Sequence, residues 1–465
     1  MATIPLPLVG PTYTNRSLPV SSQVTRNFYI EVNQQGGEPL SLMPFPGLKP
    51  WSTGAGENRG MGSLNGVLYT ISGNTLYSVE SDGTQTSAGT IDGTGRCSID
   101  SDGSNLVIAT GESKPYTYDG STLTLGTDED LPNADTVTYI NRRMVYDGAA
   151  GNVVFADLDE PLSAGSLTAI KAESKPDDMV AVDAYKQQVY AYGAETIQPL
   201  YATGDADSPY LPILNATQEI GLAAAHSVAT NNNYAYFLGS DRNVYQLGGL
   251  DVRPISNPAI GQEIAGYSDV SDAFGVCFTL DSMNFYLLSF PEGNKTWLFN
   301  EAAGLWTELA YNYDGSQHLI SDYANIYGKH LVADRRNGNI YELDFDTYTD
   351  NGDPIHRRRD TISINGATFG KPNARVFMDK LTLVIQPGAS LVTSKATVIM
   401  QYSDDNGQTW SSERWASVGE MGDYTYKLDW LSLGYFYNRM FRFTMTDPIK
   451  WVLISANADV ELEIG

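Results

Sequence analysis

Short apolar segments alternate with polar turns along the chain, and stretches with the 3.6-residue periodicity of a helix are scarce. The apolar segments are rich in Val, Ile, Tyr, Thr and Phe, which favour strands. Asn-Gly and Asp-Gly pairs separate many of them, and such pairs suit hairpin turns because type I′ geometry needs positive φ at both central residues. These pairs are Asn65-Gly66, Asp82-Gly83, Asp102-Gly103, Asp119-Gly120, Asn337-Gly338 and Asn406-Gly407. The pattern predicts an all-β protein.

Segments of similar composition recur at a regular spacing through the first three quarters of the chain. They lie near residues 68, 106, 144, 189, 234, 285 and 330, with steps of 38, 38, 45, 45, 51 and 45 residues. Repeats of about 40–50 residues with four short antiparallel strands are typical of β-propeller blades. We therefore predict a β-propeller over residues 51–353, with seven blades by this count, or six if one repeat is an insertion. The alternative is a tandem of unrelated β-sandwiches.

The two ends of the chain differ from these repeats. Residues 354–465 contain longer segments with strict alternation, such as Lys380–Ile385 and Met440–Met445, which predict a separate C-terminal antiparallel β-sandwich. Residues 1–50 have few strand signals and many prolines, which cannot donate to a strand ladder. We therefore predict an extended N-terminal arm laid over another element. The prolines are Pro5, Pro7, Pro11, Pro19, Pro44, Pro46 and Pro50.

The composition is acidic, since 55 Asp and Glu residues against 29 Lys and Arg give a formal net charge of −26. This balance disfavours tight binding to nucleic acid or to an anionic membrane, because both need clustered cations. The two cysteines, Cys97 and Cys277, are too few for a disulfide scaffold, a zinc ribbon or an iron–sulfur site. No stretch approaches the ~18 consecutive apolar residues of a transmembrane helix, and no secretory signal is visible. We expect a protein of a reducing compartment with a large core.

One motif, S-x-D-x-G-x-T-W, is present in full. We expect Asp405 and Thr409 to hydrogen-bond turn amides, Gly407 to take a positive φ, and Trp410 to bury its ring under the hairpin. This "Asp box" is frequent in sialidases, where it lies away from the catalytic centre. A single box in the predicted sandwich indicates a structural hairpin, formed by Ser403, Asp405, Gly407, Thr409 and Trp410.

The rest of the chain shows no set of residues that would carry out chemistry. Its histidines form no metal-binding array, and no nucleophile elbow, P-loop or dinucleotide fingerprint is present. Asp100–Asn105 and Asp344–Asp346 could hold Ca²⁺ loosely, although acidic hairpin tips are the favoured interpretation. No pair of carboxylates stands out as acid and base. We predict no catalytic, cofactor-binding or metal-binding residue, and a structural or binding role. The histidines are His226, His318, His330 and His356.

Three consecutive arginines, Arg357, Arg358 and Arg359, lie at the predicted junction of propeller and sandwich. Two roles are open to them from the residues alone, a clamp on the acidic surface of a neighbouring subunit and a solvated hinge, and the resemblance described below adds a contact with DNA in a channel. The clamp is our working hypothesis.

Six segments carry a resemblance to a known family. They are Gln23–Tyr29, Met43–Leu48, Lys171–Asp178, Gly193–Gln198, Trp410–Trp415 and Asp447-Pro448. In order and spacing they are similar to segments of the tail hub (nozzle) proteins of short-tailed bacteriophages, often called packaged-DNA stabilisation proteins. Gln198 departs from the family pattern, which has an acid there.

The resemblance implies a structural protein of the virion tail, made in the host cytoplasm and without enzymatic activity. It implies a homohexameric ring that extends the DNA channel below the portal and adaptor, helps to retain packaged DNA, and anchors tail fibres, tailspikes or a tail needle. A channel with acidic walls would let double-stranded DNA pass without tight binding. We expect the arm and the sandwich to make the ring contacts. The alternative function is a propeller-type glycan-binding protein or a sialidase-like glycosidase that acts on host surface polysaccharide.

Overall fold

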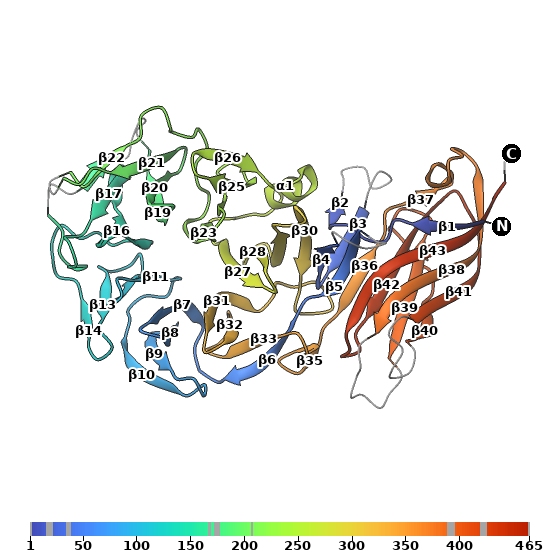
Figure 1. Cartoon of the computed structure of the whole chain (residues 1–465), viewed down its shortest axis with the longest axis horizontal. Helices are drawn as coiled ribbons and strands as arrows, with labels where there is room; N and C mark the ends of the chain where they lie inside the picture. Colours follow the sequence, from blue (N-terminus) through green and yellow to red (C-terminus); the bar gives the residue numbers. More distant parts are fainter. Residues whose placement is uncertain are drawn as a thin grey trace.

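Seven antiparallel sheets are arranged around a common centre, and a β-sandwich lies beside them (Figure 1). The computed structural model describes residues 2–14, 22–33, 39–165, 169–171, 177–205, 208–387, 396–418 and 426–463. Each of the seven sheets has four consecutive antiparallel strands, apart from the outermost strand of the last. The predicted all-β fold, with a propeller and a C-terminal sandwich, is confirmed, and the blade count is seven.

The blade strands follow the chain from the centre outward. Blade one has β7 (Asn58–Leu64), β8 (Val67–Ser72), β9 (Thr75–Val79) and β10 (Gln85–Thr90). Blade two has β11 (Ser98–Ser101), β12 (Leu106–Ala109), β13 (Tyr116–Tyr118) and β14 (Leu123–Leu125). Blade three has β15 (Val137–Ile140), β16 (Arg143–Asp147), β17 (Asn152–Phe155) and β18 (Ala169–Lys171). Blade four has β19 (Met179–Tyr185), β20 (Gln188–Gly193), β21 (Ile197–Ala202) and β22 (Tyr210–Pro212).

The last three blades follow the same order. Blade five has β23 (Ala229–Thr230), β24 (Ala235–Leu238), β25 (Val244–Gly248) and β26 (Asp251–Pro254). Blade six has β27 (Phe274–Leu280), β28 (Met283–Phe290), β29 (Lys295–Asn300) and β30 (Leu305–Leu309). Blade seven has β31 (Ile320–Ile326), β32 (Lys329–Asp334) and β33 (Ile340–Asp344), and its fourth strand is β6 (Gly47–Ser52). A short ribbon of β34 (Thr349–Asp350) and β35 (Asp353–Pro354) continues this sheet.

Turn chemistry and apolar packing explain the blades. Asn65 and Gly66, between β7 and β8, have φ of 50° and 77°, as a two-residue type I′ turn requires. Apolar side chains of one blade then pack against those of the next: Leu64 and Ile71 share a buried cluster with Leu106 and Ile108 of blade two. Every blade therefore buries both faces except at its outer edge.

The N-terminal strand β6 closes blade seven. It pairs antiparallel with β33, with Leu48 opposite Leu343, so the first and last blade strands of the chain share one sheet. Leu48 has no exposed surface. The ring is thus closed by backbone hydrogen bonds between segments almost three hundred residues apart.

The sandwich consists of two sheets with a shared apolar core. One has the order β4 (Phe28–Val32), β5 (Leu40–Pro44), β43 (Trp451–Glu463), β38 (Arg375–Pro387) and β41 (Tyr426–Phe436), with β1 (Ala2–Leu6) also paired to β43. The other includes β3 (Ser22–Arg26), β36 (Arg357–Asp360), β42 (Asn438–Met445), β39 (Thr397–Ser403) and β40 (Arg414–Ser417). Small strands β2 (Tyr13–Thr14) and β37 (Ile364–Asn365) pair with β3 and β42.

The second sheet runs without interruption from the propeller into the sandwich. β3 pairs in parallel with β30 of blade six and antiparallel with β36. The expectation of few strands in the first fifty residues is therefore wrong: their described part supplies strands to the sandwich, to blade seven and to this seam. Pairing with distant strands, which local sequence does not reveal, outweighs the low strand propensity of the prolines. The division into 1–50, 51–353 and 354–465 stays a prediction.

Helices are few. α1 (Pro258–Ala265) starts at Asn257, whose side chain accepts hydrogen bonds from the amides of Ala259 and Ile260, and Pro258 occupies the first helical position. The other helical segments of the described residues are three short turns: η1 (Ala149–Gly151), η2 (Ala225–Ser227) and η3 (Gly366–Phe369). Among the described residues, none of the helices has the length and apolar character needed to cross a membrane.

Replacing Leu48 with Ala tests the closure of blade seven. The change leaves a cavity between β6 and β33, so we expect the free energy of unfolding to fall by about 2–5 kcal/mol. Chemical denaturation followed by tryptophan fluorescence measures this. Lys49, the exposed next residue of β6, supplies the control, and Lys49→Ala should cost about 0–1 kcal/mol. Equal small effects of both changes would contradict the closure.

Candidate functional site

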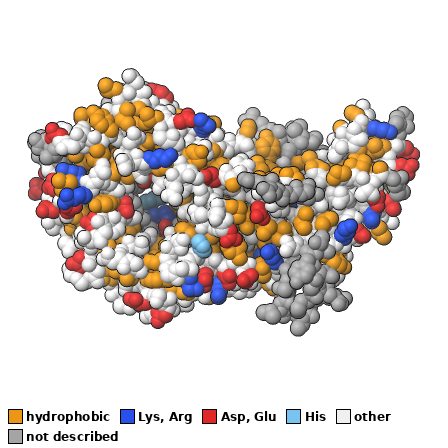
Figure 2. Space-filling view, viewed as in Figure 1, with side chains coloured by type: hydrophobic (Ala, Val, Ile, Leu, Met, Phe, Trp, Pro, Cys, Tyr) orange, Lys and Arg blue, Asp and Glu red, His pale blue; other side chains and the backbone are white. Residues whose placement is uncertain are grey.

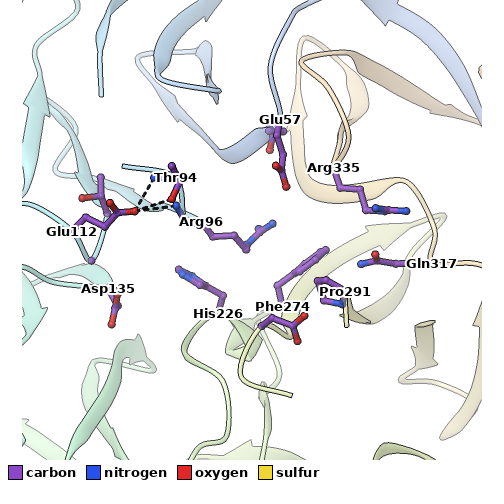
Figure 3. Close-up of a pocket in the computed structure, with 15 residues that line it drawn as sticks. Glu57, Thr94, Arg96, Glu112, Asp135, His226, Phe274, Pro291, Gln317 and Arg335 are labelled. Carbon is purple, nitrogen blue, oxygen red and sulfur yellow. Dashed lines mark hydrogen bonds between the residues drawn. The ribbon is translucent and has the colours of Figure 1, made fainter. Parts of the chain in front are cut away.

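A cavity of about 510 Å³ opens at the centre of the propeller (Figure 3). It lies where the innermost strands begin: Asn58 starts β7, Arg96 precedes β11, Asp135 precedes β15 and Phe274 starts β27. Polar and charged side chains from several blades point into it, as Figure 3 shows. Residues that lie far apart in the sequence, from Glu57 to Arg335, meet in this cavity.

Two arginines, Arg96 and Arg335, line the cavity, and Arg96 is already paired. Arg96 Nη2 donates to Asp322 Oδ1 at 2.9 Å and to the Ser321 carbonyl at 3.1 Å. Its guanidinium lies 4.2 Å from the centroid of the Phe274 ring. These contacts join the loop before β11 to β31 and β27, so Arg96 holds three blades together across the centre.

The acidic side chains of the cavity lie in two different environments. Glu112 accepts hydrogen bonds from the Thr94 amide at 2.7 Å and the Gly95 amide at 3.3 Å, and these bonds lower its pKa. Burial raises the pKa values of Asp135 and Asp272. Glu112 therefore fixes a loop, whereas Asp135 and Asp272 resist ionisation.

His226, on η2, is half-buried in the cavity wall, and burial lowers its pKa to about 3. It is therefore neutral at physiological pH. Among the described residues, no group of three or more His, Cys, Asp or Glu is placed to hold a metal ion. The cavity can hydrogen-bond a polar molecule, and the contacts of Arg96 and Glu112 described above position loops.

A second group of acids lies along the propeller axis. Asp183 of β19 has one carboxylate oxygen without a partner in the described structure, and burial, reinforced by the charge of Asp100 on β11, raises its pKa to about 7. Asp100 is held by the Tyr139 amide at 2.7 Å, but burial also raises its pKa. Burial, with the charges of Glu301 and Asp183, keeps Cys277 a thiol. Blades two, four and six supply the members of this group, so motif and spacing analysis of the sequence could not predict it.

Replacing Asp183 with Asn should stabilise the protein at high pH only. Because the folded-state pKa lies above the ordinary value, the wild type loses stability as pH rises from about 4 to 7, the window between unfolded and folded pKa. Asn carries no charge, so we expect the variant to be more stable on the order of 1–2 kcal/mol at pH 8 and nearly equal at pH 4.

Denaturation curves at both pH values measure this difference. Asp130→Asn, at an exposed loop, is the control and should leave the pH profile unchanged. An unchanged profile for Asp183→Asn would contradict the proposed cost of its ionisation.

The three arginines at the junction do not share one environment. β36 is a strand, so its side chains alternate, and Arg357 and Arg359 lie on the inner face with 0% and 1% exposure. Arg359 donates from Nε to the Leu8 carbonyl at 2.6 Å and from Nη1 to Thr25 Oγ1 at 2.8 Å and the Gly10 carbonyl at 3.3 Å. It fastens the N-terminal segment of the same chain.

This burial contradicts the clamp for Arg357 and Arg359, because a contact with a neighbouring subunit needs an accessible guanidinium. It equally contradicts a solvated hinge for those two. Only Arg358 is partly exposed, and it pairs with Asp360, which also binds Arg442 at 3.0 Å. A role of Arg358 in subunit contact stays a prediction.

Of the two buried arginines, Arg357 makes fewer side-chain hydrogen bonds than Arg359. Its three guanidinium nitrogens have no hydrogen-bond partner in the described structure, and burial lowers its pKa to about 10. Asp350, with 2% exposure, is the nearby countercharge, and burial raises its pKa to about 7. His318 Nε2 lies 3.7 Å from Asp350 Oδ2. Unlike Arg359, Arg357 therefore adds a charge to the seam without adding hydrogen bonds.

Arg359→Ala should destabilise the seam strongly. It leaves several N-terminal carbonyls without a donor and a void in the core, so we expect a loss on the order of 3 kcal/mol in the free energy of unfolding. Arg253→Ala is the control, because Arg253 is 70% exposed and pairs with an exposed acid. Chemical denaturation compares the two variants. Equal losses would show that Arg359 does not fasten the N-terminus.

The Asp box forms the hairpin turn that its sequence predicts. Asp405 Oδ1 accepts from the Thr409 amide and from Ser403 Oγ, and the bonds from Thr409, first its hydroxyl, lower the pKa of Asp405 to about 2. Gly407 has φ of 90°. Trp410 is half-buried, and Arg442 stacks on its ring at 3.6 Å. The ring thus carries a cation above it as well as the hairpin.

In each of the two acidic loops, one carboxylate accepts hydrogen bonds within its own turn. Asp102 Oδ1 accepts from the amides of Ser104 and Asn105 at 2.7 and 2.6 Å. Asp344 accepts from the Asp346 amide at 3.1 Å and from Thr347 Oγ1 at 2.8 Å. These contacts agree with the hairpin-tip interpretation.

The side chains of the other three histidines lie next to aromatic side chains. His330 Nδ1 lies 2.7 Å from the Tyr323 hydroxyl, and His356 packs against the Tyr313 ring at 4.3 Å. His318 lies 6.0 Å from the Phe45 ring.

Two side chains in the segments that carry the family resemblance make hydrogen bonds to backbone amides and carbonyls. Asp177 accepts from the amides of Glu195 and Thr196, both at 2.8 Å, and a Cβ at Gly193 would meet this carboxylate at 2.2 Å. Asn27 takes a φ of 59° and bonds the carbonyls of Ala310 and His356. Residues 172–176 of the mid-chain segment lie outside the described residues.

The protein is a seven-bladed propeller whose sheet continues into a β-sandwich. Ion pairs fix the centre of the propeller and the seam between the two parts. These features place the chain in the class of β-propeller scaffold proteins. The family model "Bacteriophage P22 Gp10, beta-propeller" matches residues 2–348, and "Bacteriophage P22 Gp10, beta-sandwich" matches residues 362–461. The chain belongs to the bacteriophage P22 Gp10 family. The first match begins at residue 2 and so includes the segment predicted as a separate arm.

A curated relative supports the same family. The chain is 24% identical over 272 residues to the tail hub protein gp10 of Salmonella phage P22. The alignment spans 54% of this chain and 57% of the relative.

Solved propeller structures are similar only in outline. BamB from Moraxella catarrhalis has a TM-score of 0.38 at 8% identity, covering 74% of this chain and 98% of its own. The N-terminal domain of Nup159 has a TM-score of 0.41 at 12% identity, and the match covers 70% of this chain and 99% of that domain. The fold assignment therefore rests on the sheet order and the family models.

Proposed function

We propose that this chain is the tail hub of a short-tailed phage, a structural subunit of the virion tail without enzymatic activity. The observation that carries the proposal is the match of both P22 Gp10 family models, in order, to residues 2–348 and 362–461. The hub would extend the DNA channel below the portal and adaptor, help to retain packaged DNA, and anchor fibres, tailspikes or a needle.

The rigid joint between propeller and sandwich supports a load-transmitting role. The sheet that continues from β30 through β3 and β36 into β42 resists bending between the two halves, because backbone hydrogen bonds cross the junction. Glu308 binds Arg26 at 3.1 Å and Lys295 at 2.6 Å on this sheet. Such a joint suits a subunit that holds a tail against a capsid.

The charge of the surface supports passage of DNA. The chain carries −26, and Figure 2 shows acidic side chains spread over the propeller rim and the free end of the sandwich. In a ring, such walls would repel phosphates and so let DNA slide.

Exposed apolar side chains on the sandwich are the proposed ring contacts. Leu431 and Tyr435 on the edge strand β41 are 60% and 47% exposed, and Trp415 on β40 is 60% exposed. Apolar surface of this kind, on strands with free edges, favours association with another subunit. Strands of the N-terminal segment pair within their own chain, and a part of that segment in the ring contacts stays a prediction.

Assembly tests the proposal. We expect the protein, alone or with a purified portal–adaptor complex, to form rings with a central hole in negative-stain images, six subunits each. Leu431→Asp should reduce ring formation at least tenfold in analytical ultracentrifugation, because it places a charge in the contact.

Leu214→Asp is the matched control, since Leu214 is 86% exposed on a propeller loop. It should assemble like the wild type. A wild-type chain that stays monomeric in both conditions, or that releases sugar from bacterial polysaccharide, would overturn the proposal. Equal assembly of Leu431→Asp and Leu214→Asp would contradict the proposed contact at β41 but not the tail-hub role.

A further inference from the structure

A polar groove of about 400 Å³ lies between blades four and five, apart from the central cavity. Lys186 on the β19–β20 turn, Asn232 and Tyr234 before β24, and Gln246 on β25 line it. These turns follow the ends of the innermost strands, whereas the central cavity lies where such strands begin. The groove is therefore on the opposite face of the propeller.

Several hydrogen-bonding groups in the groove are uncommitted. The side-chain amides of Asn232 and Gln246 and the Tyr234 hydroxyl have no partner among the described residues. Their neighbours are occupied: Asn233 donates to Glu301, and Arg253 pairs with Asp251 at 2.6 Å. Two amides and a phenol thus offer both donors and acceptors to a molecule in the groove.

A glycine keeps the Tyr234 ring in place. A Cβ at Gly248 would lie 3.2 Å from Tyr234 Cε1, so a larger residue would displace the ring. On its other side, Tyr234 packs against Tyr236 with centroids 6.1 Å apart. The ring is half-buried and forms an apolar platform among polar groups.

We propose that this groove binds an oligosaccharide. Sugar hydroxyls need donors and acceptors side by side, which amides supply, and the C–H face of a sugar packs on an aromatic ring. A peptide with an apolar anchor would need a more apolar lining, and a nucleic acid would need several unpaired cations. Lys186 is the one cation of the groove lining, within the described residues, that no acid pairs.

Lys186 adds a preference for acidic sugars. Its ammonium donates to the Asn233 carbonyl at 3.2 Å and lies 4.8 Å from the Tyr185 ring centroid. Both contacts leave the charge exposed, so a sugar carboxylate could approach it. The proposal goes beyond the tail-hub role and does not depend on it.

An array of defined oligosaccharides, with neutral and carboxylated members, tests the proposal with the full-length protein. We expect the wild type to bind a subset, and titration calorimetry with the tightest-binding member to show at least a tenfold loss of affinity for Tyr234→Ala. Gln246→Ala should lose about fivefold. Lys186→Ala should lose affinity at least fivefold for carboxylated members and little for neutral ones.

Tyr437→Ala is the matched control, because Tyr437 is 63% exposed and lies between β41 and β42 of the sandwich, outside the propeller. It should bind like the wild type. Gly248→Val, which displaces the ring without removing a polar group, should also abolish binding, and circular dichroism confirms that each variant is folded.

Binding of no array member by the wild type would overturn the proposal, as would unchanged affinity of both Tyr234→Ala and Gln246→Ala. Ring assembly of these variants is measured separately. A failure of sugar binding with normal rings therefore contradicts the groove alone.

Discussion

Backbone pairing by the N-terminal strands holds the two halves of this protein together. β6 completes blade seven, β3 lies between β30 and β36, and β1, β4 and β5 complete a sheet of the sandwich. A propeller is stable when its ring closes, since an unpaired edge exposes a row of N–H and C=O groups. One segment closes the ring and joins it to the sandwich, so neither half reaches its final form before the N-terminus is in place.

Buried charge directs the path of that segment. Arg359 binds carbonyl groups of Leu8 and Gly10, so the N-terminal backbone must pass over this guanidinium to satisfy it. A buried arginine contributes little net stability compared with an apolar side chain, but leaving it unpaired is costly. Its effect is therefore to exclude other paths. Arg357 and Asp350, buried close by, add the cost of two desolvated charges to the same seam.

The sequence predicted the elements that repeat locally and missed those that pair over a distance. Turn pairs such as Asn65-Gly66 recur with the blades, so the propeller could be derived from spacing. The strand β6 could not be derived in this way, because it contains Pro50 and proline disfavours strands. In the structure, Pro50 lies beside a register shift, where a strand tolerates proline. The central cavity could not be predicted, because Arg96 and Asp322 meet only when the ring closes. The burial of Arg357 and Arg359 follows from strand alternation once β36 is recognised, but the charged segment Arg357–Asp360 has no strand signal of its own.

The segments that carry the family resemblance turn out to serve the backbone. Asp177 satisfies the amides of the turn after β20, and Asn27 bridges blade six to the residue before β36. A carboxylate or amide in such a place has few substitutes, because losing it leaves buried donors or acceptors unpaired. Exposed turns whose side chains make no such contacts can change at little cost to the fold. The backbone contacts of the propeller can thus be kept while much of the remaining sequence changes, as the 24% identity to the P22 relative over the aligned part allows.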